Sequence, residues 1–212
     1  RAMMAEKGYS DADVSHKITP IGGGPKLVNV TFHVGEGPKT RIRSIEFVGN
    51  AAISDRKLRK QMKENKPKGF LPLIMSDGTY KEAHYESDAD LVQAHYRTQG
   101  YVRARVGQPE INVLEDSADG KTRWIQLRIP VTEGPRYRVG EFTIDGNTVV
   151  DTELIRPIFE LETGDWYDEK RVRDGLIEVQ GMYGAGGYME FTGFPDLELS
   201  DEPDAAVPEI LA

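Results

Sequence analysis

Two runs of the sequence gather carboxylates closely enough to suggest acid–base chemistry. They are residues 86–90, Glu-Ser-Asp-Ala-Asp, and residues 165–169, Asp-Trp-Tyr-Asp-Glu. A pair of carboxyl groups can act as general acid and general base. Both runs lie where a helical pattern begins, however, and the dipole of a helix stabilises negative charge at its N-terminus. We therefore interpret both runs as helix N-termini and predict that the chain has no catalytic residues.

The residue types that bind metals and phosphates do not show the spacing of such sites. His16, His33, His84 and His95 are 17, 51 and 11 residues apart, which places no two of them as neighbouring ligands. The absence of cysteine excludes disulfides, zinc–thiolate sites and thiol catalysis. The glycine cluster at 181–187 ends a helical pattern, whereas a phosphate loop begins a helix. We predict no metal, no cofactor and no enzyme activity.

The charge of the chain argues against nucleic acid as a partner. Its 212 residues include 27 Lys and Arg against 35 Asp and Glu, a net charge of -8. Surfaces that bind nucleic acid need a basic excess. The sequence also has no signal peptide at its start and no apolar run near the roughly 18 residues that mark a membrane-spanning helix. We expect a soluble piece, with any anchor outside it.

One segment has side chains suited to contact a partner. Lys63, Lys66 and Lys68 lie in a region that reads as a loop, where they either face solvent or contact lipid headgroups or an acidic partner. The apolar residues that follow either pack beneath the helices or contact a partner. This possible partner loop contains Phe70, Leu71, Leu73, Ile74 and Met75.

The sequence repeats itself at an offset of 97 residues. Residues 36–50 align with residues 133–147 at six identical positions of fifteen, and both segments begin with Glu-Gly-Pro and end with Gly-Asn. A second marker, Gly-Tyr, occurs at 8–9, 100–101 and 187–188. Repeats of this length indicate an array of similar units. We therefore predict three copies of one unit.

Hydrophobic periodicity predicts the order strand, helix, helix, strand, strand in each unit. In the middle copy the first strand covers residues 41–48 and the last covers 123–131. The second strand is expected at 101–106, resuming towards Val113. Ser54 is expected to cap the first helix, over residues 55–62. The second helix is expected to begin at a capping box formed by Ser87 and Asp90 and to end at Gly100.

The predicted fold class is α+β, with two helices on one face of a three-stranded sheet. Residues 1–35 hold the C-terminal part of a first unit, and residues 36–136 form a complete unit. Residues 137–199 form a unit without a visible third strand, and residues 200–212 are an acidic tail. In the last unit, Pro157 falls inside the expected first helix, where an interior proline costs up to about 3 kcal/mol.

The order of these markers resembles POTRA domains, the polypeptide-transport-associated repeats that precede the outer-membrane barrel in BamA-type assembly factors. The resemblance is carried by Gly-Asn at 49–50 and 146–147, by the Tyr…Gly-Tyr helix ends at 96–101 and 183–188, and by the Glu-Gly-Pro junctions. It extends to about Leu199. It implies tandem β-α-α-β-β repeats with a three-stranded mixed sheet whose third strand is central.

A central third strand leaves the second strand at a sheet edge. Unpaired backbone groups at such an edge can add an extended segment of another polypeptide, although an edge can also be blunted and bind nothing. In the middle unit the predicted edge is Val102, Arg103, Ala104, Arg105 and Val106, with the two arginines facing outward.

The resemblance implies a location at the periplasmic face of the bacterial outer membrane. The implied partners are unfolded outer-membrane clients, accessory lipoproteins and a C-terminal membrane β-barrel of the same protein. A partner-secretion or plastid-type import transporter would share the repeats, and a cell-division scaffold would carry one of them after a membrane helix. Alternating strands of about ten residues downstream of Ala212 would favour the barrel proteins.

Overall fold

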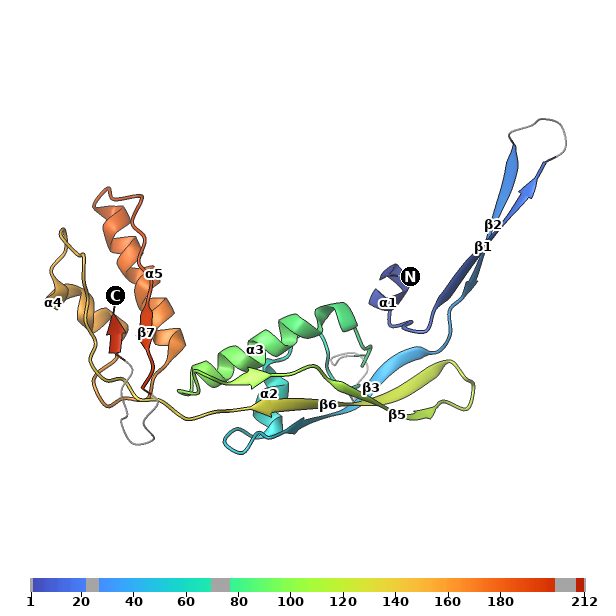
Figure 1. Cartoon of the computed structure of the whole chain (residues 1–212), viewed down its shortest axis with the longest axis horizontal. Coiled ribbons are helices and arrows are strands. Elements are labelled where there is room, and N and C mark those ends of the chain that lie inside the picture. The colour runs from blue at the N-terminus through green and yellow to red at the C-terminus, as the bar shows by residue number, and fades with distance from the viewer. Residues whose placement is uncertain (1, 22–26, 70–76, 201–208, 212) are drawn as a thin grey trace. The chain divides into compact units, whose positions relative to one another are not determined.

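The computed structural model describes residues 2–21, 27–69, 77–200 and 209–211 (Figure 1). Its contacts divide the chain into two compact units. The first unit consists of Arg1–Val48, Ser54–Leu91 and Val106–Pro130, and the second consists of Gly49–Ile53, Val92–Arg105 and Val131–Ala212. The middle copy of the repeat therefore contributes residues to both units.

The first unit begins with helix α1 (Ala2–Glu6) and an antiparallel hairpin of β1 (Asp13–Pro20) and β2 (Val28–Gly35). One face of this hairpin is apolar and open to solvent. Its residues Val28, Val30, Phe32 and Val34 are 48% to 67% exposed. Their counterparts at the 97-residue offset, Ile125, Leu127, Ile129 and Val131, are all buried. The same alternating apolar pattern thus forms a buried sheet face in the middle copy and a solvent-exposed face in the first.

The sheet of the middle copy is mixed and has β6 at its centre. Its strands are β3 (Lys39–Val48), β4 (Arg105–Val106), β5 (Glu110–Asp116) and β6 (Thr122–Thr132). β3 pairs with β6 in parallel, whereas β5 pairs with β6 antiparallel, and the order is β3-β6-β4. The predicted first and last strands are confirmed. The second strand is divided into β4 and β5, so it begins later than the predicted Tyr101 and its resumed part extends to Asp116, past the predicted Val113.

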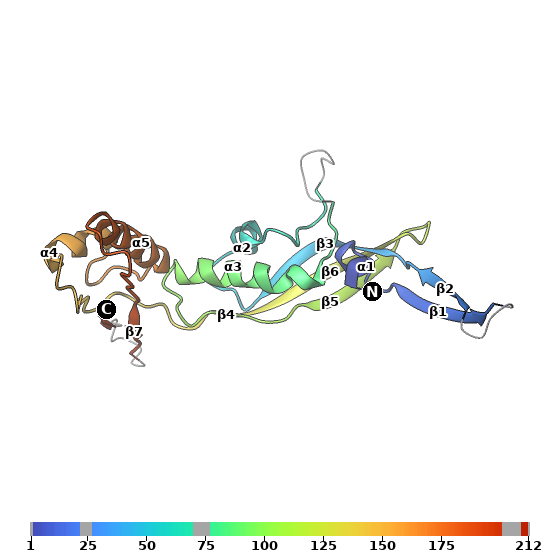
Figure 2. The same ribbon diagram turned by 90° about the horizontal axis from the view of Figure 1, so that it is seen from above.

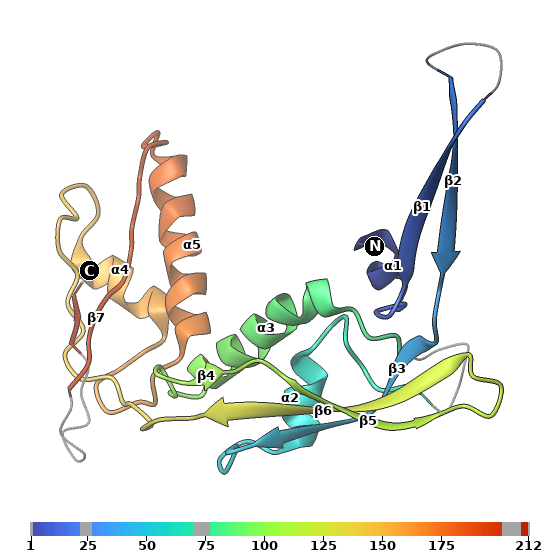
Figure 3. The ribbon, with the colours of Figure 1, turned by 45° about the vertical axis from the view of Figure 1, so that its right-hand side comes forward.

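Helices lie on one side of this sheet (Figures 2 and 3). They are α2 (Asp55–Gln61), the short 3-10 helix η1 (Glu82–His84) and α3 (Tyr85–Arg97). Alternate residues of β3 and β6 point towards them because successive strand side chains face opposite sides. The buried side chains of this layer include Ile42, Ile45, Leu58, Met62, Ile125 and Leu127, none more than 2% exposed. This arrangement confirms the predicted α+β class.

The starts of the two helices differ from the prediction. Ser54 does precede α2, but its side chain makes no capping hydrogen bond. α3 begins at Tyr85, so Ser87 and Asp90 lie inside the helix, and the predicted capping box was wrong. The turn of η1 precedes α3 directly, and the Tyr85 amide already bonds the Glu82 carbonyl. The helix therefore begins before Ser87 is reached.

The repeated Gly-Tyr marker is a helix C-cap in all three copies. The glycine has a φ of 88° to 90°, a conformation that only glycine adopts at low cost. The tyrosine amide then bonds a carbonyl five residues earlier, as in a Schellman motif. These bonds run from Tyr9 to Met4, from Tyr101 to Tyr96 and from Tyr188 to Tyr183, at 2.9 to 3.0 Å. Gly100 was predicted to end α3, and this is confirmed.

The other markers of the middle copy meet at Glu133, in the second unit. Its carboxylate accepts hydrogen bonds from the Tyr96 hydroxyl (2.9 Å) and from the Ala52 amide (3.0 Å). Gly49 has a φ of 93°, and a Cβ added there would lie 2.3 Å from the Val131 carbonyl oxygen. Residues of the Glu-Gly-Pro, Gly-Asn and Tyr markers, far apart in the sequence, thus lie close together in the middle copy.

The third copy, in the second unit, has complete helices and an incomplete sheet. Its elements are α4 (Thr152–Ile155), the 3-10 helix η2 (Arg156–Phe159), α5 (Glu169–Ala185), β7 (Asp196–Glu198) and β8 (Glu209–Leu211). Pro157 was expected inside the first helix, whereas the helix changes from α to 3-10 at Arg156 and Pro157 lies in the first turn of η2 rather than in a helix interior. No third strand was visible in the sequence, whereas the structure has the short β8 paired antiparallel with β7.

Gly175 has a packing role in α5. A Cβ at this position would lie 2.5 Å from the Phe159 ring, so glycine lets the helix approach η2 closely. Around this contact lies a core of nine buried residues. They are Val139, Phe142, Ile155, Phe159, Leu161, Tyr167, Val172, Val179 and Tyr183. This third copy therefore has a packed core beneath its helices.

Candidate protein-binding edge

The free edge of the middle sheet is β5. Its seven residues are all exposed, and the strand pairs with β6 on one side only. Within the described part of the chain, no backbone group of Glu110–Asp116 is bonded to anything but β6. Ile111 and Val113 pair across from the buried Leu127 and Ile125, yet they are 47% and 60% exposed. β5 therefore offers both unpaired backbone and apolar side chains.

The opposite edge, β3, is closed by neighbouring loops. The Thr40 amide bonds the Gly8 carbonyl (2.8 Å), and the Thr40 carbonyl accepts from the Tyr80 amide (3.1 Å). Ile42 is held in the same way, since its amide bonds the Gly78 carbonyl and its carbonyl accepts from the Lys68 amide. An added strand would have to displace these bonds. Of the two edges, β5 is the one ready to accept a strand.

Two side chains from α2 complete the closure of β3. The Arg59 guanidinium donates to the Ile45 carbonyl at 2.9 Å, and the Phe47 amide donates to the Asp55 carboxylate at 3.3 Å. Both bonds occupy backbone groups of β3 beyond Ile42. The closed edge therefore runs along most of the strand.

The predicted edge residues lie next to β5 rather than on it. Val102 and Arg103 form a turn, Ala104 is buried, and only Arg105 and Val106 are in a strand, β4. Both arginines are exposed, as the alternation predicted. Residues 107–109, which belong to no strand, separate β4 from β5. A binding role for residues 102–106 stays a prediction.

The predicted partner loop, with Phe70, Leu71, Leu73, Ile74 and Met75, lies outside the described residues. The segment that follows it is held by Asp77, whose carboxylate accepts from the Thr79 amide (3.0 Å) and hydroxyl (2.6 Å) and from Lys39 (3.1 Å). Burial raises the pKa of Asp77, but the hydrogen bonds from Thr79 and Lys39 outweigh burial and hold that pKa below its ordinary value.

The residue that fixes the start of this inter-helix segment was missed by the sequence analysis. Asp88 is completely buried in α3, and its carboxylate accepts three backbone amides, those of Lys63 (2.6 Å), Glu64 (3.0 Å) and Asn65 (2.7 Å). The acidic run that contains Asp88 was interpreted as a helix N-terminus only. Its bonding partners are 23 to 25 residues away in sequence, so no local pattern could identify them.

The second acidic run does cap a helix. Asp168 precedes α5, and its side chain accepts from the Lys170 amide at 2.8 Å and the Arg171 amide at 3.4 Å.

Across the described residues, no group of three His, Asp or Glu side chains is placed to hold a metal ion. Also among them, no helix is both long and apolar enough to cross a membrane.

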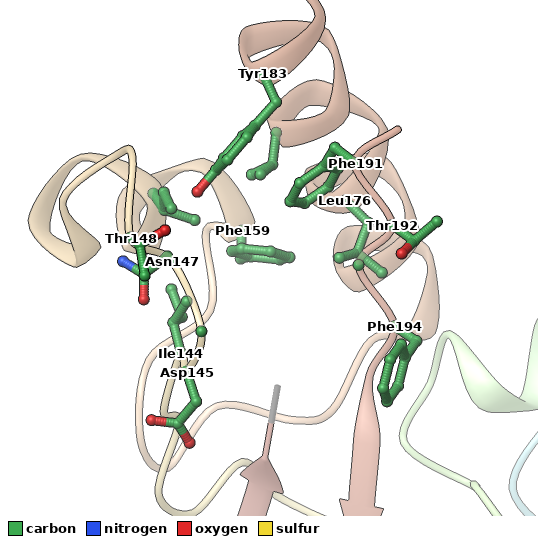
Figure 4. A pocket seen from close by; sticks show the side chains of 14 residues that line it. Ile144, Asp145, Asn147, Thr148, Phe159, Leu176, Tyr183, Phe191, Thr192 and Phe194 are labelled. Carbon is green, nitrogen blue, oxygen red and sulfur yellow. The ribbon is translucent and has the colours of Figure 1, made fainter. Parts of the chain in front are cut away.

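A mostly apolar pocket of about 440 Å³ lies in the third copy (Figure 4). Ile144 and Asp145 line one side, Phe191 and Phe194 the other, and Phe159 lies above. In the middle copy, the strand that precedes α2 is separated from the strand that follows α3 by the central strand β6. The pocket occupies the corresponding place between residues 144–148 and 191–194.

Fold and edge together define a tandem array of small α+β repeats whose middle copy presents an open sheet edge. A family model, POTRA, described as surface antigen variable number repeat, matches residues 40–134 and 137–206. The chain therefore belongs to the POTRA family.

Several relatives of known name resemble the chain. It is 28% identical over 183 residues to the outer membrane protein assembly factor BamA of Neisseria meningitidis, covering 86% of this chain and 22% of the relative. It is 27% identical over 188 residues to a putative outer membrane protein assembly factor of Treponema pallidum, covering 89% and 21%. The chain thus spans about a fifth of the length of these relatives. Their names are those of assembly factors, not of enzymes.

Solved structures show the same fold. The crystal structure of Haemophilus influenzae BamA POTRA3-5 aligns with a TM-score of 0.57 and 20% identity, covering all of this chain and 75% of that one. BamA of Haemophilus ducreyi lacking POTRA domains 1-3 aligns with a TM-score of 0.54 and 14% identity, covering 81% and 28%. At these identities the likeness concerns the fold alone.

Proposed function

We propose that the chain is the periplasmic POTRA region of an outer-membrane protein assembly factor, and that β5 of its middle repeat binds unfolded β-rich clients by strand addition. The relatives named as assembly factors support the first part. The second part rests on one observation, the contrast between the open edge of β5 and the closed edge of β3.

Strand addition suits a receptor for many clients. Its affinity comes from main-chain hydrogen bonds, which every extended segment can make, and side chains at alternate positions add a limited preference. The exposed Ile111 and Val113 provide a surface on which alternate apolar side chains of a client would pack. Arg105, exposed on the neighbouring β4, would discourage self-pairing between copies, since like charges at an edge oppose it.

Accessory lipoproteins and a membrane β-barrel of the same protein are further proposed partners. They are the partners that the resemblance to BamA-type assembly factors implies, and they are proposed on that ground alone.

The proposal is tested by titrating the labelled protein with a peptide from an outer-membrane β-strand and following amide chemical shifts. We expect shifts along Glu110–Asp116 and at Arg105–Val106, with the amides of β3 unchanged. A variant with Val113 replaced by proline removes a backbone donor from β5 and should weaken binding. The same replacement at Ala118, an exposed residue of the β5–β6 turn, is the control. Shifts confined to the helices would refute the proposal.

A further inference from the structure

A groove lies beside the free edge of β5, in the first unit. It has a volume of about 380 Å³ and runs between the start of α3 and the beginning of β5. Ile111 is the β5 residue that lines it. The remaining lining residues are Tyr80, Glu82, Ala83, Tyr85, Glu86, Gln108 and Pro109. The groove is thus placed where side chains of a strand added to β5 would point.

The groove is negatively charged. Glu82 and Glu86 are four residues apart, both are exposed, and neither has an ion-pair partner among the residues that the structure describes. The nearby cations are already paired. Lys81 bonds Glu64 at 2.7 Å, and Arg128 lies 3.6 Å from Glu110. Burial, and then the negative charge of Glu82, raise the pKa of Tyr80 to about 12. Glu82 and Glu86 are therefore the only charged residues that line the groove among the described residues.

The groove also has an apolar wall. Ile111, Pro109 and Ala83 line it, and Ile111 is 47% exposed. A lysine or arginine suits such a place, because its aliphatic stem packs on apolar surface while its charged end reaches an acid. A metal ion would gain nothing from the apolar wall. The chemistry of the groove thus favours a long basic side chain.

Side chains of a β-strand alternate between its two faces, so every second residue of an added strand faces the same side as Ile111 and Val113. We propose that the strand bound at β5 carries a basic residue at one of these positions, directed to Glu82 and Glu86, with apolar residues two positions away. This inference rests on the proposed function, since it assumes that β5 adds a strand. It assigns a charge preference to a contact whose backbone part is independent of sequence.

The preference is tested with three synthetic peptides of nine residues in which valine alternates with threonine and the central valine is replaced by lysine, glutamine or glutamate. Binding to the whole chain is measured by fluorescence anisotropy at about 50 mM and 300 mM salt. We expect the lysine peptide to bind about three- to tenfold more tightly than the glutamine peptide at low salt, and the glutamate peptide to bind most weakly. Salt should reduce these differences because it screens exposed charges.

Two variants separate the groove from the general charge of the protein. The double variant E82Q/E86Q should bind the lysine and glutamine peptides equally. The double variant E141Q/E178Q removes the same charge from exposed positions of the third copy and should keep the preference.

The outcomes distinguish a failure of the charge preference from a failure of strand addition at β5. Equal binding of all three peptides to the unaltered protein, with shifts at β5, would overturn the charge preference and leave strand addition intact. A preference that E82Q/E86Q retains would place the acidic contact elsewhere and also overturn it. No binding of any peptide at β5 would overturn both.

Discussion

Arg59 and Arg156 make the same hydrogen bond in two copies of the repeat. Arg59 donates to the carbonyl of Ile45 at 2.9 Å, and Arg156 donates to the carbonyl of Phe142 at 2.8 Å, in each case fourteen residues earlier in the chain. The two pairs are 97 residues apart, the offset of the sequence repeat. Each arginine therefore ties the first helix of its copy to the strand segment before it.

Replacing Arg59 with alanine should destabilise the protein by about 1–3 kcal/mol. The Ile45 carbonyl would lose a charged donor in a partly buried position. Arg56, one turn earlier on α2, is exposed and serves as the control, with an expected change within about 0.5 kcal/mol. Urea unfolding followed by circular dichroism measures both. Equal effects of the two replacements would show that the bond to Ile45 contributes nothing.

Gly49 and Gly146 form a matched pair at the same offset. Both have positive φ, 93° and 76°, so alanine is strained at either position by about 1 kcal/mol. Only at Gly49 would the new Cβ also lie 2.3 Å from a backbone atom, the Val131 oxygen, whereas Gly146 has nothing within 4 Å. We expect Gly49→Ala to cost about 1–3 kcal/mol more than Gly146→Ala in urea unfolding. Similar costs would mean that backbone strain alone requires these glycines.

Replacing Asp88 with asparagine should destabilise the protein by about 2–4 kcal/mol. The carboxylate accepts three amides in a fully buried site, and an amide side chain would present a donor to one of them. Asp90→Asn is the control, because Asp90 is exposed on the same helix. Hydrogen exchange adds a local measurement, since the amides of Glu64 and Asn65 should lose protection. Unchanged protection would contradict the anchoring role.

The sequence was sufficient to predict features that depend on local chemistry. Gly100 ends α3 because its positive φ is a property of the residue itself, and β3 and β6 were found because alternation over ten residues is a strong signal. The β-α-α-β-β order followed from these signals and from the repeat. None of these features depends on contacts between distant residues.

The candidate site depends on distant contacts, and for this reason only part of it was predicted. The second strand was predicted at 101–106, resuming towards Val113, whereas the structure has a short β4 and a longer β5. Between them lies Gly107, whose amide bonds the Pro130 carbonyl. The closure of β3 by loop backbones has no sequence signature, because any residue can donate an amide. The groove beside β5 combines residues more than 20 positions apart, and only the fold brings them together.

The last prediction concerns Glu133, the junction residue of the middle copy. Its carboxylate holds the Tyr96 hydroxyl at 2.9 Å and the Ala52 amide at 3.0 Å, so Glu133→Gln replaces one acceptor by a donor. We expect a loss of about 1–2 kcal/mol in urea unfolding. Glu36 is the matched control, since it occupies the same Glu-Gly-Pro motif in the first copy but is exposed and has no hydrogen bond within the described part of the chain.

A double-mutant cycle tests whether the contact between Glu133 and Tyr96 is responsible. Tyr96→Phe removes only the hydroxyl from a side chain that is fully buried. If the two groups act on one another, the double variant should lose less stability than the two single variants together, by about 0.5–1.5 kcal/mol. Strictly additive losses would mean that Glu133 acts through Ala52 alone. In that case the joint occurrence of the tyrosine and the Glu-Gly-Pro motif in this sequence would need another physical explanation.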